Sequence, residues 1–455
     1  MKFTQRIVFL LLAVSHVSSD IESNKATQSE DNPSARFEAL HYAKIKLQSL
    51  LTKLKGFWEE LETLLSSVLV GLGDRVNSKD LRLVAAVWRH GSRAPVANVF
   101  RFPNDQLAKQ WPRGLAELTY GMEHQFRRLF IAHRAFQKGI QEQCLLGEFL
   151  QQRYKEFMTN YSTETIYVRS SDSNRTIMSG LATISGFIPP SALSMNGDAF
   201  SAYQTIPIHR TPLKHDRTLD VTYANCPPPY RPFILKVANA TSDKSVSLVD
   251  PKVLQLVESK LGKKLQKMEL FLFAEATICY HYDGKASLLP EWLQIPEVYE
   301  KVEQSYAMAL FGQQMNPEIQ RLRGSNLFKE IADRFMKKAT EKEANKLQFI
   351  GYSTHDMTLL ALLADWGVLK PDLFPEFSSC IMVELYEHAS IHYVEIWYRR
   401  GHGKKPVQLK IKDCREPCKL QEFVAIAEKY ASVNITADCE KFKELGLQFV
   451  DQKLT

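Results

Sequence analysis

Beyond its first 19 residues, the 455-residue sequence has no uninterrupted apolar run long enough to cross a bilayer. Its last residues, Val450–Thr455, carry neither an anchor signal nor a retention signal. At the other end, Lys2 and Arg6 precede the short apolar stretch Ile7–Val14. A positive start, a short apolar core and small residues at the end of segment 1–19 are typical of a secretory signal peptide. We therefore expect a secreted or lysosomal protein without a stable membrane anchor.

The chain also lacks the concentrated basic stripe that is typical of nucleic-acid-binding proteins. Its formal net charge is +7, and removal of the signal peptide takes away Lys2 and Arg6. An apolar content of 45% and a charged content of 24% are ordinary for a globular protein. We expect no nucleic-acid partner, and the length allows one large or two medium domains with substantial cores.

Cysteine is scarce, with seven in the chain. An odd number leaves one cysteine over, and the sequence alone does not give the pairing. Secretion favours disulfides over free thiols, and the spacing of Cys414 and Cys418 favours a small closed loop. A zinc site is a poor alternative, because neither a second cysteine pair nor a His-Glu-x-x-His helix accompanies them.

The strongest positive signal is a short apolar run that ends in charged residues. Leu83–Trp88 has the length and the β-branched content of a buried parallel strand. Arg89–Arg93, which reads Arg-His-Gly-Ser-Arg, follows it directly. In α/β sheets, ligands bind at the carboxyl ends of the strands. Two arginines there would form a planar, permanently charged clamp suited to phosphate oxygens.

Two more strand-like runs, Thr165–Arg169 and Leu347–Tyr352, also end near charged residues. The first ends in Arg169, and the second leads to His355 and Asp356. In a doubly wound sheet these strand ends lie side by side, which would gather three arginines, two histidines and one carboxylate. Arginines at such a density repel one another unless a dianion lies between them. The sequence therefore predicts a phosphate site.

These motifs resemble those of the histidine phosphatase superfamily, in its acid phosphatase and phytase branch, over most of residues 80–445. The segment Arg89–Pro95 is similar to the family's signature, Tyr167–Thr176 to its second arginine motif, and Tyr352–Asp356 to its His-Asp dyad. Ser92 departs from the pattern, because an aspartate is common there. We expect Ser92 to hydrogen-bond within its loop, the alternative being a lost contact to the imidazole and a lower turnover.

The order of strand, loop and helix indicates a doubly wound α/β sheet, and the resemblance adds an inserted, mainly helical cap. Alternating apolar and polar residues at Cys380–Tyr386 and His392–Tyr398 predict antiparallel strands, so the sheet is expected to be mixed, with helices on both faces. The predicted division is a signal peptide (1–19), a polar segment with an extra helix (20–78), an α/β domain (79–200 and 345–455) and a cap (201–344).

The predicted function is that of an acid phosphatase acting on phosphate monoesters. His90 is the expected nucleophile that forms a phosphohistidine, and Asp356 is the expected general acid for the leaving alcohol. The groups expected to bind the phosphate oxygens are Arg89, Arg93, Arg169 and His355. Guanidinium groups beside His90 disfavour its charged form and lower its pKa, which keeps a neutral nitrogen available. No metal or cofactor is expected.

Three alternatives remain open. A phytase-like inositol phosphate hydrolase would need extra basic residues in the cap, where the candidates are Lys244, Lys252, Lys260, Lys263 and Lys264. A phosphoglycerate-mutase-like transferase shares the Arg-His-Gly start, but the signal peptide and the cysteines of the tail argue against it. A catalytically weak surface or binding protein of the same fold is favoured by Ser92 and by the additional N-terminal segment.

Two segments depart from the family pattern. Between Leu40 and Val68, apolar residues recur at steps of three and four. This pattern predicts an amphipathic helix docked on the main body, or a coiled coil that would form a homodimer. The sequence predicts that Arg128–Leu145 interrupts one continuous helix between Phe126 and Leu146. We expect a surface bulge or the product of an unusual transcript, the alternative being a segment that lines the cap or binds a partner.

The family resemblance also implies two long-range disulfides, Cys226–Cys439 and Cys279–Cys380, beside Cys414–Cys418. Cys144 is then the unpaired thiol. Glycosylation is expected at Asn160, Asn239 and Asn434, each of which begins a sequon. A fourth sequon at Asn174 lies close to the proposed pocket, where a glycan would obstruct entry.

Overall fold

The computed structural model describes residues 80–101, 104–118, 138–158, 160–189, 206–213, 215–219, 221, 226, 228–232, 251–265, 267–314, 316–341, 345–431 and 434–451. The predicted signal peptide, the segment 20–78 with its docked or dimerising helix, and the sequon at Asn239 lie outside these residues, as does the first part of the predicted insertion, 128–137. What the sequence predicted for these segments stays a prediction.

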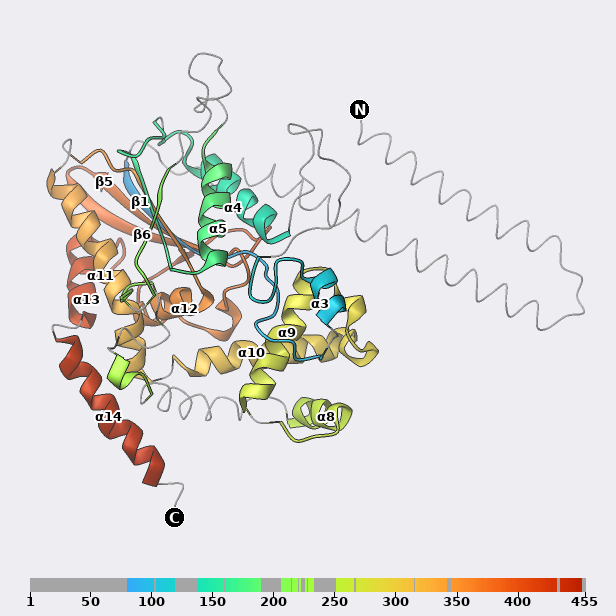
Figure 1. Ribbon diagram of the computed structural model, residues 1–455. Coiled ribbons are helices and arrows are strands. Elements are labelled where there is room, and N and C mark those ends of the chain that lie inside the picture. Colours follow the sequence, from blue (N-terminus) through green and yellow to red (C-terminus); the bar gives the residue numbers. More distant parts are fainter. Residues whose placement is uncertain are drawn as a thin grey trace, which may run out of the picture. The chain divides into compact units, whose positions relative to one another are not determined.

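One mixed sheet organises the described part of the chain (Figure 1). Its strands are β1 (Leu81–Arg89), β2 (Ile166–Ser170), β3 (Ile208–Arg210), β4 (Phe349–Thr354), β5 (Cys380–His388), β6 (Ile391–Arg399) and β7 (Val407–Leu409). Their order across the sheet is β3-β2-β4-β1-β5-β6-β7. The first four are parallel to one another, and β5, β6 and β7 are antiparallel to their neighbours. The sequence predicted five of these strands, and the short edge strands β3 and β7 carried no recognisable signal.

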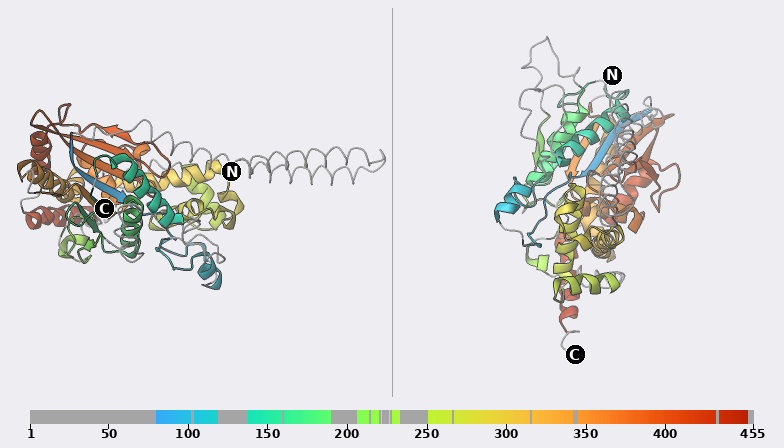
Figure 2. Two further views of the ribbon diagram at one scale, coloured as in Figure 1. Left: turned by 90° about the horizontal axis from the view of Figure 1, so that it is seen from above. Right: turned by 90° about the vertical axis from the view of Figure 1, so that its right-hand side faces the viewer.

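The central strand β1 is buried on both faces, which explains its unbroken apolar sequence. Leu83, Ala85 and Val87 point into the core on one side of the sheet. Val84 and Trp88 point into the core on the other side. Each of the five is fully buried, and in Figure 2 β1 (blue) runs between the helices of the two layers. The doubly wound mixed sheet predicted from the sequence is therefore confirmed.

Helices cover both faces of the sheet. On the face of Trp88 pack α4 (Lys138–Tyr154) and α5 (Asn174–Phe187). On the opposite face pack α11 (Pro317–Glu341), α12 (Asp356–Asp365) and α13 (Leu420–Tyr430). The remaining described helices are α3 (Asn104–Gln110), α8 (Pro251–Leu261), α9 (Lys267–Tyr282), α10 (Pro296–Gly312) and α14 (Ile435–Asp451), with short 3₁₀ turns at Pro228–Tyr230, Ala286–Leu288, Glu291–Leu293 and Pro371–Leu373.

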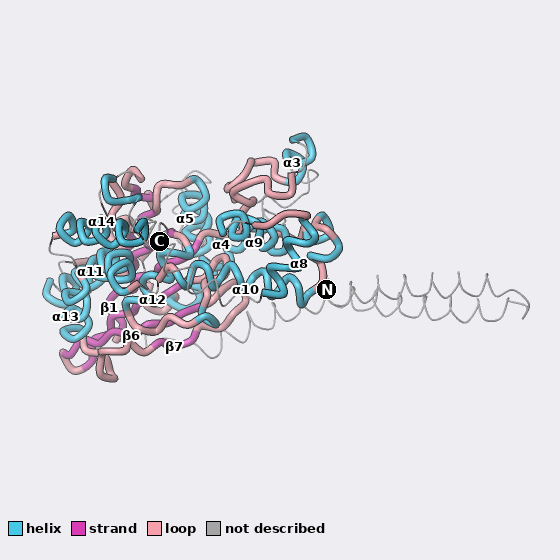
Figure 3. Tube along the Cα trace, turned by 90° about the horizontal axis from the view of Figure 1, so that it is seen from below, coloured by secondary structure: helices cyan, strands magenta, loops and turns pink. Residues whose placement is uncertain are grey.

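A separate, smaller core lies among the helices of the predicted cap. Residues of α8, α9 and α10 pack there with Trp111 and Ala94. In Figure 3 these helices lie to the right of the strands. The predicted cap range 201–344 extends too far, however, because α11 packs its apolar side against the sheet and β3 pairs with β2. The division into an α/β domain and a cap remains a prediction. Helix α11 and strand β3, which were predicted to lie in the cap, belong to the part of the chain that forms and covers the sheet.

Two of the three predicted disulfides are present, Cys226–Cys439 and Cys414–Cys418. The third, Cys279–Cys380, is wrong, because both thiols are free and buried. Cys279 lies on α9 in the core of the cap helices, whereas Cys380 begins β5 in the core of the sheet. The two residues thus belong to different cores. Cys144, the cysteine predicted to be left over, lies on α4.

Three sequons of the chain lie within the residues that the structure describes. Asn160, Asn174 and Asn434 are exposed, and glycosylation of Asn160 and Asn434 stays a prediction. Asn434 Oδ1 accepts a hydrogen bond from the Ala437 N–H in the first turn of α14. Within the described ranges, no helix combines the length and the apolarity needed to span a membrane.

Candidate active site

The carboxyl ends of β1 and β4 bring the two predicted histidines together. The strands are parallel neighbours with Arg89 opposite Thr354, and the His90 N–H donates to the Thr354 carbonyl over 3.0 Å. As a result the rings of His90 and His355 lie edge to face, with 5.6 Å between their centres. The site thus forms where the sequence placed it, at adjacent strand ends.

His90 is held as a neutral imidazole with one defined free nitrogen. Its side chain is buried, and Nδ1 lies 2.9 Å from the carbonyl oxygen of Gly91. A carbonyl can only accept, so Nδ1 carries the proton and Nε2 keeps its lone pair. Burial, followed by the charges of Arg175, Arg89 and Arg93, holds the pKa of His90 well below its usual value. The imidazole therefore remains unprotonated in acid solution, as a nucleophile requires.

Three guanidinium groups surround this imidazole. Arg89 Nη1 donates to the Pro375 carbonyl over 2.7 Å, and its guanidinium stacks 4.1 Å from the centre of the Phe377 ring. Arg93 Nη1 donates to the Ala94 carbonyl over 3.0 Å. Arg175, in the first turn of α5, places Nη2 3.5 Å from His355 Nδ1. Arg89 and Arg93 lie beside His90, as predicted from the sequence, whereas Arg175 was not among the predicted site residues.

The donors of these arginines are not all satisfied. The Nε–H groups of Arg89, Arg93 and Arg175 are buried and have no hydrogen-bond partner among the residues that the structure describes. A buried donor without a partner costs about 1–3 kcal/mol, and more when it is charged. Burial, followed by the charge of Arg93, lowers the pKa of Arg175 to about 10. Arg175 therefore stays charged at and below neutral pH, and a bound oxyanion would satisfy the free donors.

The structure does not bring Arg169 to this cluster, which corrects the prediction from the sequence. Arg169 pairs with Asp216 over 3.0 Å and with Glu330 of α11 over 3.1 Å. Ile166 and Val168 of the same strand face α4 and α5. Side chains alternate along a strand, so Arg169 points to the opposite layer, toward α11. It stabilises that layer, and Arg175 is the third arginine of the site.

His355 is also neutral, and its hydrogen bonds fix which nitrogen carries the proton. Ser171 Oγ donates to Thr176 Oγ1 over 2.9 Å and lies 2.9 Å from His355 Nε2. With the serine proton already donated, Nε2 carries the imidazole proton and Nδ1 accepts from Arg175. Burial, followed by the charge of Arg175, lowers the pKa of His355 to about 3. A bound dianion would favour the charged imidazolium and make His355 a second donor to the ligand.

Asp356 supplies the carboxylate of the cluster. As the first residue of α12, it accepts the Met357 N–H at Oδ1 over 2.8 Å. Its Oδ2 lies 2.8 Å from Arg89 Nη2 and 3.4 Å from the hydroxyl of Tyr306. Burial alone would raise the pKa of Asp356, but Arg89 and Arg93 outweigh it and lower the pKa. The carboxyl group is therefore ionised in the empty site.

The helices of the cap reach the site through Arg93. Glu275 of α9 forms a buried ion pair with Arg93, and its other oxygen accepts the Val96 N–H over 3.2 Å. Burial alone would lower the pKa of Arg93, but the Glu275 carboxylate reverses this and raises it. Cys279, one turn further along α9, places its sulfur 3.7 Å from Arg93 Nη1. The sequence gave no signal for Glu275, because the pairing joins distant parts of the chain.

The first turns of α4 support the loop that carries His90. Glu142 accepts the Ser92 N–H over 2.8 Å, and Ser92 Oγ lies 2.8 Å from each of its carboxylate oxygens. Gln143 Nε2 donates to the Arg89 carbonyl over 3.0 Å. Residues 138–145 are thus part of a core helix, which corrects the prediction that the whole segment Arg128–Leu145 is a surface bulge. The hydroxyl of Ser92 was expected to hydrogen-bond within its loop, but the structure shows it bonded to Glu142 of α4.

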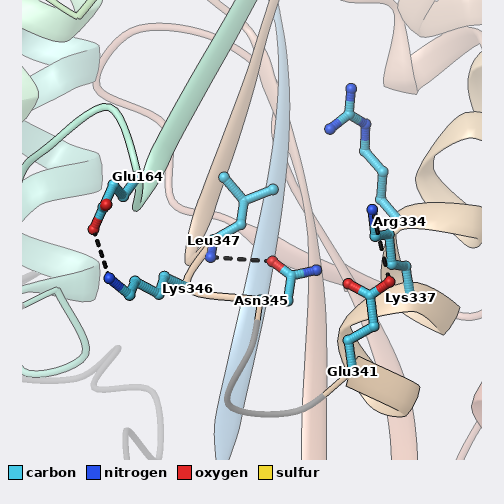
Figure 4. A pocket seen from close by; sticks show the side chains of 7 residues that line it. All are labelled: Glu164, Arg334, Lys337, Glu341, Asn345, Lys346 and Leu347. Carbon is cyan, nitrogen blue, oxygen red and sulfur yellow. Dashed lines mark hydrogen bonds and ion pairs between the residues drawn. The ribbon is translucent and has the colours of Figure 1, made fainter.

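A pocket lies elsewhere and does not include the residues of this cluster (Figure 4). It is lined by Glu164, Arg334, Lys337, Glu341, Asn345, Lys346 and Leu347. Glu164 and Leu347 come just before β2 and β4, so this pocket lies at the amino ends of those strands. Its charges are paired, Lys346 with Glu164 and Lys337 with Glu341. Among the described side chains, no group of three or more His, Cys, Asp or Glu residues is arranged to hold a metal ion.

A neutral histidine ringed by arginines at the carboxyl end of a mixed α/β sheet defines an enzyme that acts on phosphate esters. The model of the histidine phosphatase superfamily, branch 2, matches residues 80–399 of the chain, and the chain belongs to that family. The family expected from the sequence is thereby confirmed.

Known relatives agree with this placement. Prostatic acid phosphatase of Bos taurus is 28% identical over 383 residues, which cover 83% of this chain and 92% of that protein. Lysosomal acid phosphatase of Homo sapiens is 28% identical over 370 residues, which cover 80% of this chain and 81% of that protein.

Two solved structures share the fold. The phytase of Hafnia alvei in its apo form has a TM-score of 0.53 and 14% identity, covering 79% of this chain and 98% of that one. The phytase of Citrobacter braakii has a TM-score of 0.53 and 15% identity, covering 79% and 99%.

Proposed function

We propose that this protein is an acid phosphatase that hydrolyses phosphate monoesters through a phosphohistidine on His90. The observation that carries the proposal is a neutral imidazole at the end of β1 with three arginines around it that have free buried donors, two from the same strand end and one from α5. Relatives at 28% identity over most of the chain are acid phosphatases by name, which supports the same reaction here.

In the first step His90 Nε2 attacks phosphorus, and the bond between phosphorus and the ester oxygen breaks. Arg89, Arg93 and Arg175 neutralise the charge on the phosphoryl oxygens. The bound phosphate draws Arg89 away from Asp356, which raises the pKa of the carboxyl group and lets it take up a proton from solvent. The leaving alkoxide then takes this proton from Asp356. In the second step water attacks the phosphohistidine, Asp356 accepts a proton from that water, and inorganic phosphate leaves with His90 restored.

The substrate class proposed is a simple phosphate monoester, with the phytase-like alternative less well supported. Several phosphates on one substrate would need basic side chains of the cap beyond the three arginines. Two of the candidate lysines, Lys263 and Lys264, are exposed and pair with Glu269 and Glu258 instead. We further propose that the protein acts in the secretory pathway, as a secreted or lysosomal enzyme, which two disulfides in the described part of the chain support.

The test is hydrolysis of p-nitrophenyl phosphate by the secreted protein between pH 3 and 8, for wild type and His90→Ala. Activity on the acid side of neutrality and its loss in the variant are expected. Acid-labile label from a labelled ester should map to His90 in the wild type. His388→Ala is the control, because His388 is exposed at the end of β5. Label on a serine, or hydrolysis by His90→Ala, would contradict the mechanism.

A further inference from the structure

The peptide group between Gly91 and Ser92 is hydrogen-bonded at both ends. Its carbonyl accepts the proton of His90 Nδ1 over 2.9 Å. Its N–H donates to Glu142 Oε2 over 2.8 Å. One planar amide group therefore lies between the nucleophilic imidazole and a buried carboxylate.

The position of Glu142 is fixed by close packing of α4 against the loop. A Cβ atom added to Gly91 would lie 2.0 Å from the Gly139 carbonyl oxygen, and one added to Gly139 would lie 2.0 Å from the Ser92 carbonyl oxygen. Helix and loop therefore meet backbone to backbone. Glu142 itself is 6% exposed. Burial raises the pKa of Glu142, whereas Lys138 and the hydrogen bonds from Ser92 oppose this rise.

Hydrogen bonds in a chain polarise one another, most strongly where water is excluded. An amide N–H that donates to a carboxylate shifts electron density onto the carbonyl oxygen of the same peptide group. That oxygen then accepts more strongly from His90 Nδ1. The imidazole gains electron density at Nε2, and the positive charge that develops on the ring during attack on phosphorus is stabilised.

Building on the function proposed above, we propose that Glu142 is a positioning residue that acts on His90 through the Gly91–Ser92 peptide group. It holds the proton on Nδ1 and makes Nε2 more nucleophilic. The carboxylate touches neither the substrate site nor the imidazole in any contact described above, so its effect on catalysis passes through the backbone of the loop. Ser92 contributes its backbone N–H, and its hydroxyl is a second, separate link to Glu142.

The test compares Glu142→Gln with Ser92→Ala. Glutamine keeps the size of Glu142 and removes its charge, whereas alanine at 92 keeps the peptide N–H and removes only the hydroxyl. Because hydrogen bonds to charged groups are stronger than those to neutral groups, phosphohistidine formation in a single turnover should slow about tenfold in Glu142→Gln. The Kd for inorganic phosphate should stay within about twofold, since the phosphate-binding arginines are unchanged. Ser92→Ala should lose less, and Glu148→Gln on the same helix is the matched control for removing a charge from α4.

A second measurement is independent of turnover. The Nδ1 proton of His90, assigned by its absence in His90→Asn, should move upfield in Glu142→Gln and stay in place in Ser92→Ala. An unchanged resonance in Glu142→Gln would overturn the proposal, as would equal kinetic losses in the two variants, which would mean that Glu142 only anchors the loop.

If Glu142→Gln does not fold, Glu142→Asp is tested in its place. The aspartate side chain is shorter by one methylene group, so its carboxylate lies further from the Ser92 N–H. An upfield shift with slower phosphohistidine formation would support the proposal, and wild-type values of both would overturn it. A wild-type protein without phosphatase activity would refute the proposed function, while the resonance would still decide the link from Glu142 to His90.

Discussion

Arg89 and Asp356 form an ion pair inside the site, with 2.8 Å between Nη2 and Oδ2. The pair has two consequences. It holds the proposed general acid in its ionised form while the site is empty, and it occupies one arginine that the phosphate needs. Binding of a phosphate dianion competes with Asp356 for Arg89, so the carboxyl group gains its proton when the substrate arrives.

Asp356→Asn should keep phosphate affinity and slow the release of poor leaving groups most. We expect a loss of about 100-fold or more for an alkyl phosphate and of less than about tenfold for p-nitrophenyl phosphate, because a phenolate leaves without a proton. Single-turnover rates on the two esters measure the difference. Equal losses for both esters would contradict the role of general acid. Tyr306→Phe, which removes only the hydroxyl 3.4 Å from Asp356, is the control.

Anion binding should take up protons in acid solution. The pKa of His355 is lowered to about 3 in the empty site, and a bound dianion raises it. Between about pH 3 and 6 binding therefore converts neutral His355 to the imidazolium, and affinity for the dianion rises as the pH falls. Titration calorimetry with sulfate in buffers of different ionisation enthalpy should detect up to about two protons taken up, one by His355 and one by Asp356. The uptake should fall in His355→Gln, and its absence in the wild type would refute the prediction.

Substitution of Arg175 should lower activity, whereas substitution of Arg169 should lower stability. Arg175→Ala removes charge from the site and should lower kcat/KM about 100-fold or more. Arg169→Ala should retain phosphate affinity but lose about 3 kcal/mol of unfolding free energy, because Asp216 is left buried without its partner. Urea unfolding and steady-state kinetics on both variants test this pair. A large rise in the Kd for phosphate in Arg169→Ala would restore the original assignment of that arginine.

The two disulfides should differ in their contribution to stability. Cys226–Cys439 closes a sequence separation of 213 residues, and Cys414–Cys418 closes one of 4. The chain-entropy model gives about 5 kcal/mol for the first and about 2 kcal/mol for the second. Urea unfolding of Cys226→Ala/Cys439→Ala and of Cys414→Ala/Cys418→Ala measures the difference. Mass mapping should find Cys279 and Cys380 as thiols, and a bond between them would contradict the structure.

Gly139→Ala should disable the enzyme without touching a catalytic group. The new methyl would lie 2.0 Å from the Ser92 carbonyl oxygen and push the loop away from α4. We expect a loss of about 3 kcal/mol in unfolding free energy and most of the activity. Gly180→Ala on α5 is the control, because its Cβ would meet its nearest neighbours at an ordinary 3.5 Å. Equal behaviour of the two variants would refute the close contact of α4 with the loop.

The sequence predicted the strands that are buried on both faces, together with His90, His355 and Asp356 at their ends. It misplaced the third arginine, because a charged residue at a strand end was assumed to face the crevice. The alternation of Ile166 and Val168 with Tyr167 and Arg169 was the available signal that Arg169 faces the other layer. A cation in the first turn of α5 is unfavourable near a helix N-terminus, and this could have drawn attention to Arg175.

The error at α4 has a different cause. Gly121 and Gln125 have the same spacing as Gly139 and Gln143. Apolar periodicity continues equally well from either stretch into Leu146, so periodicity alone does not choose between them. Only the packing of Gly139 on the loop and the hydrogen bonds of Gln143 identify the stretch that supports the site.

The ion pair between Arg93 and Glu275 links the affinity for phosphate to the position of a cap helix. Arg93 is shared between the site and α9, so any change that moves α9 alters the field around His90. Variants designed in α9 to change the choice of alcohol will therefore alter phosphate inhibition as well, even where the new side chain never meets the substrate. In the proposed mechanism, the release of phosphate and the position of α9 therefore both depend on the guanidinium group of Arg93.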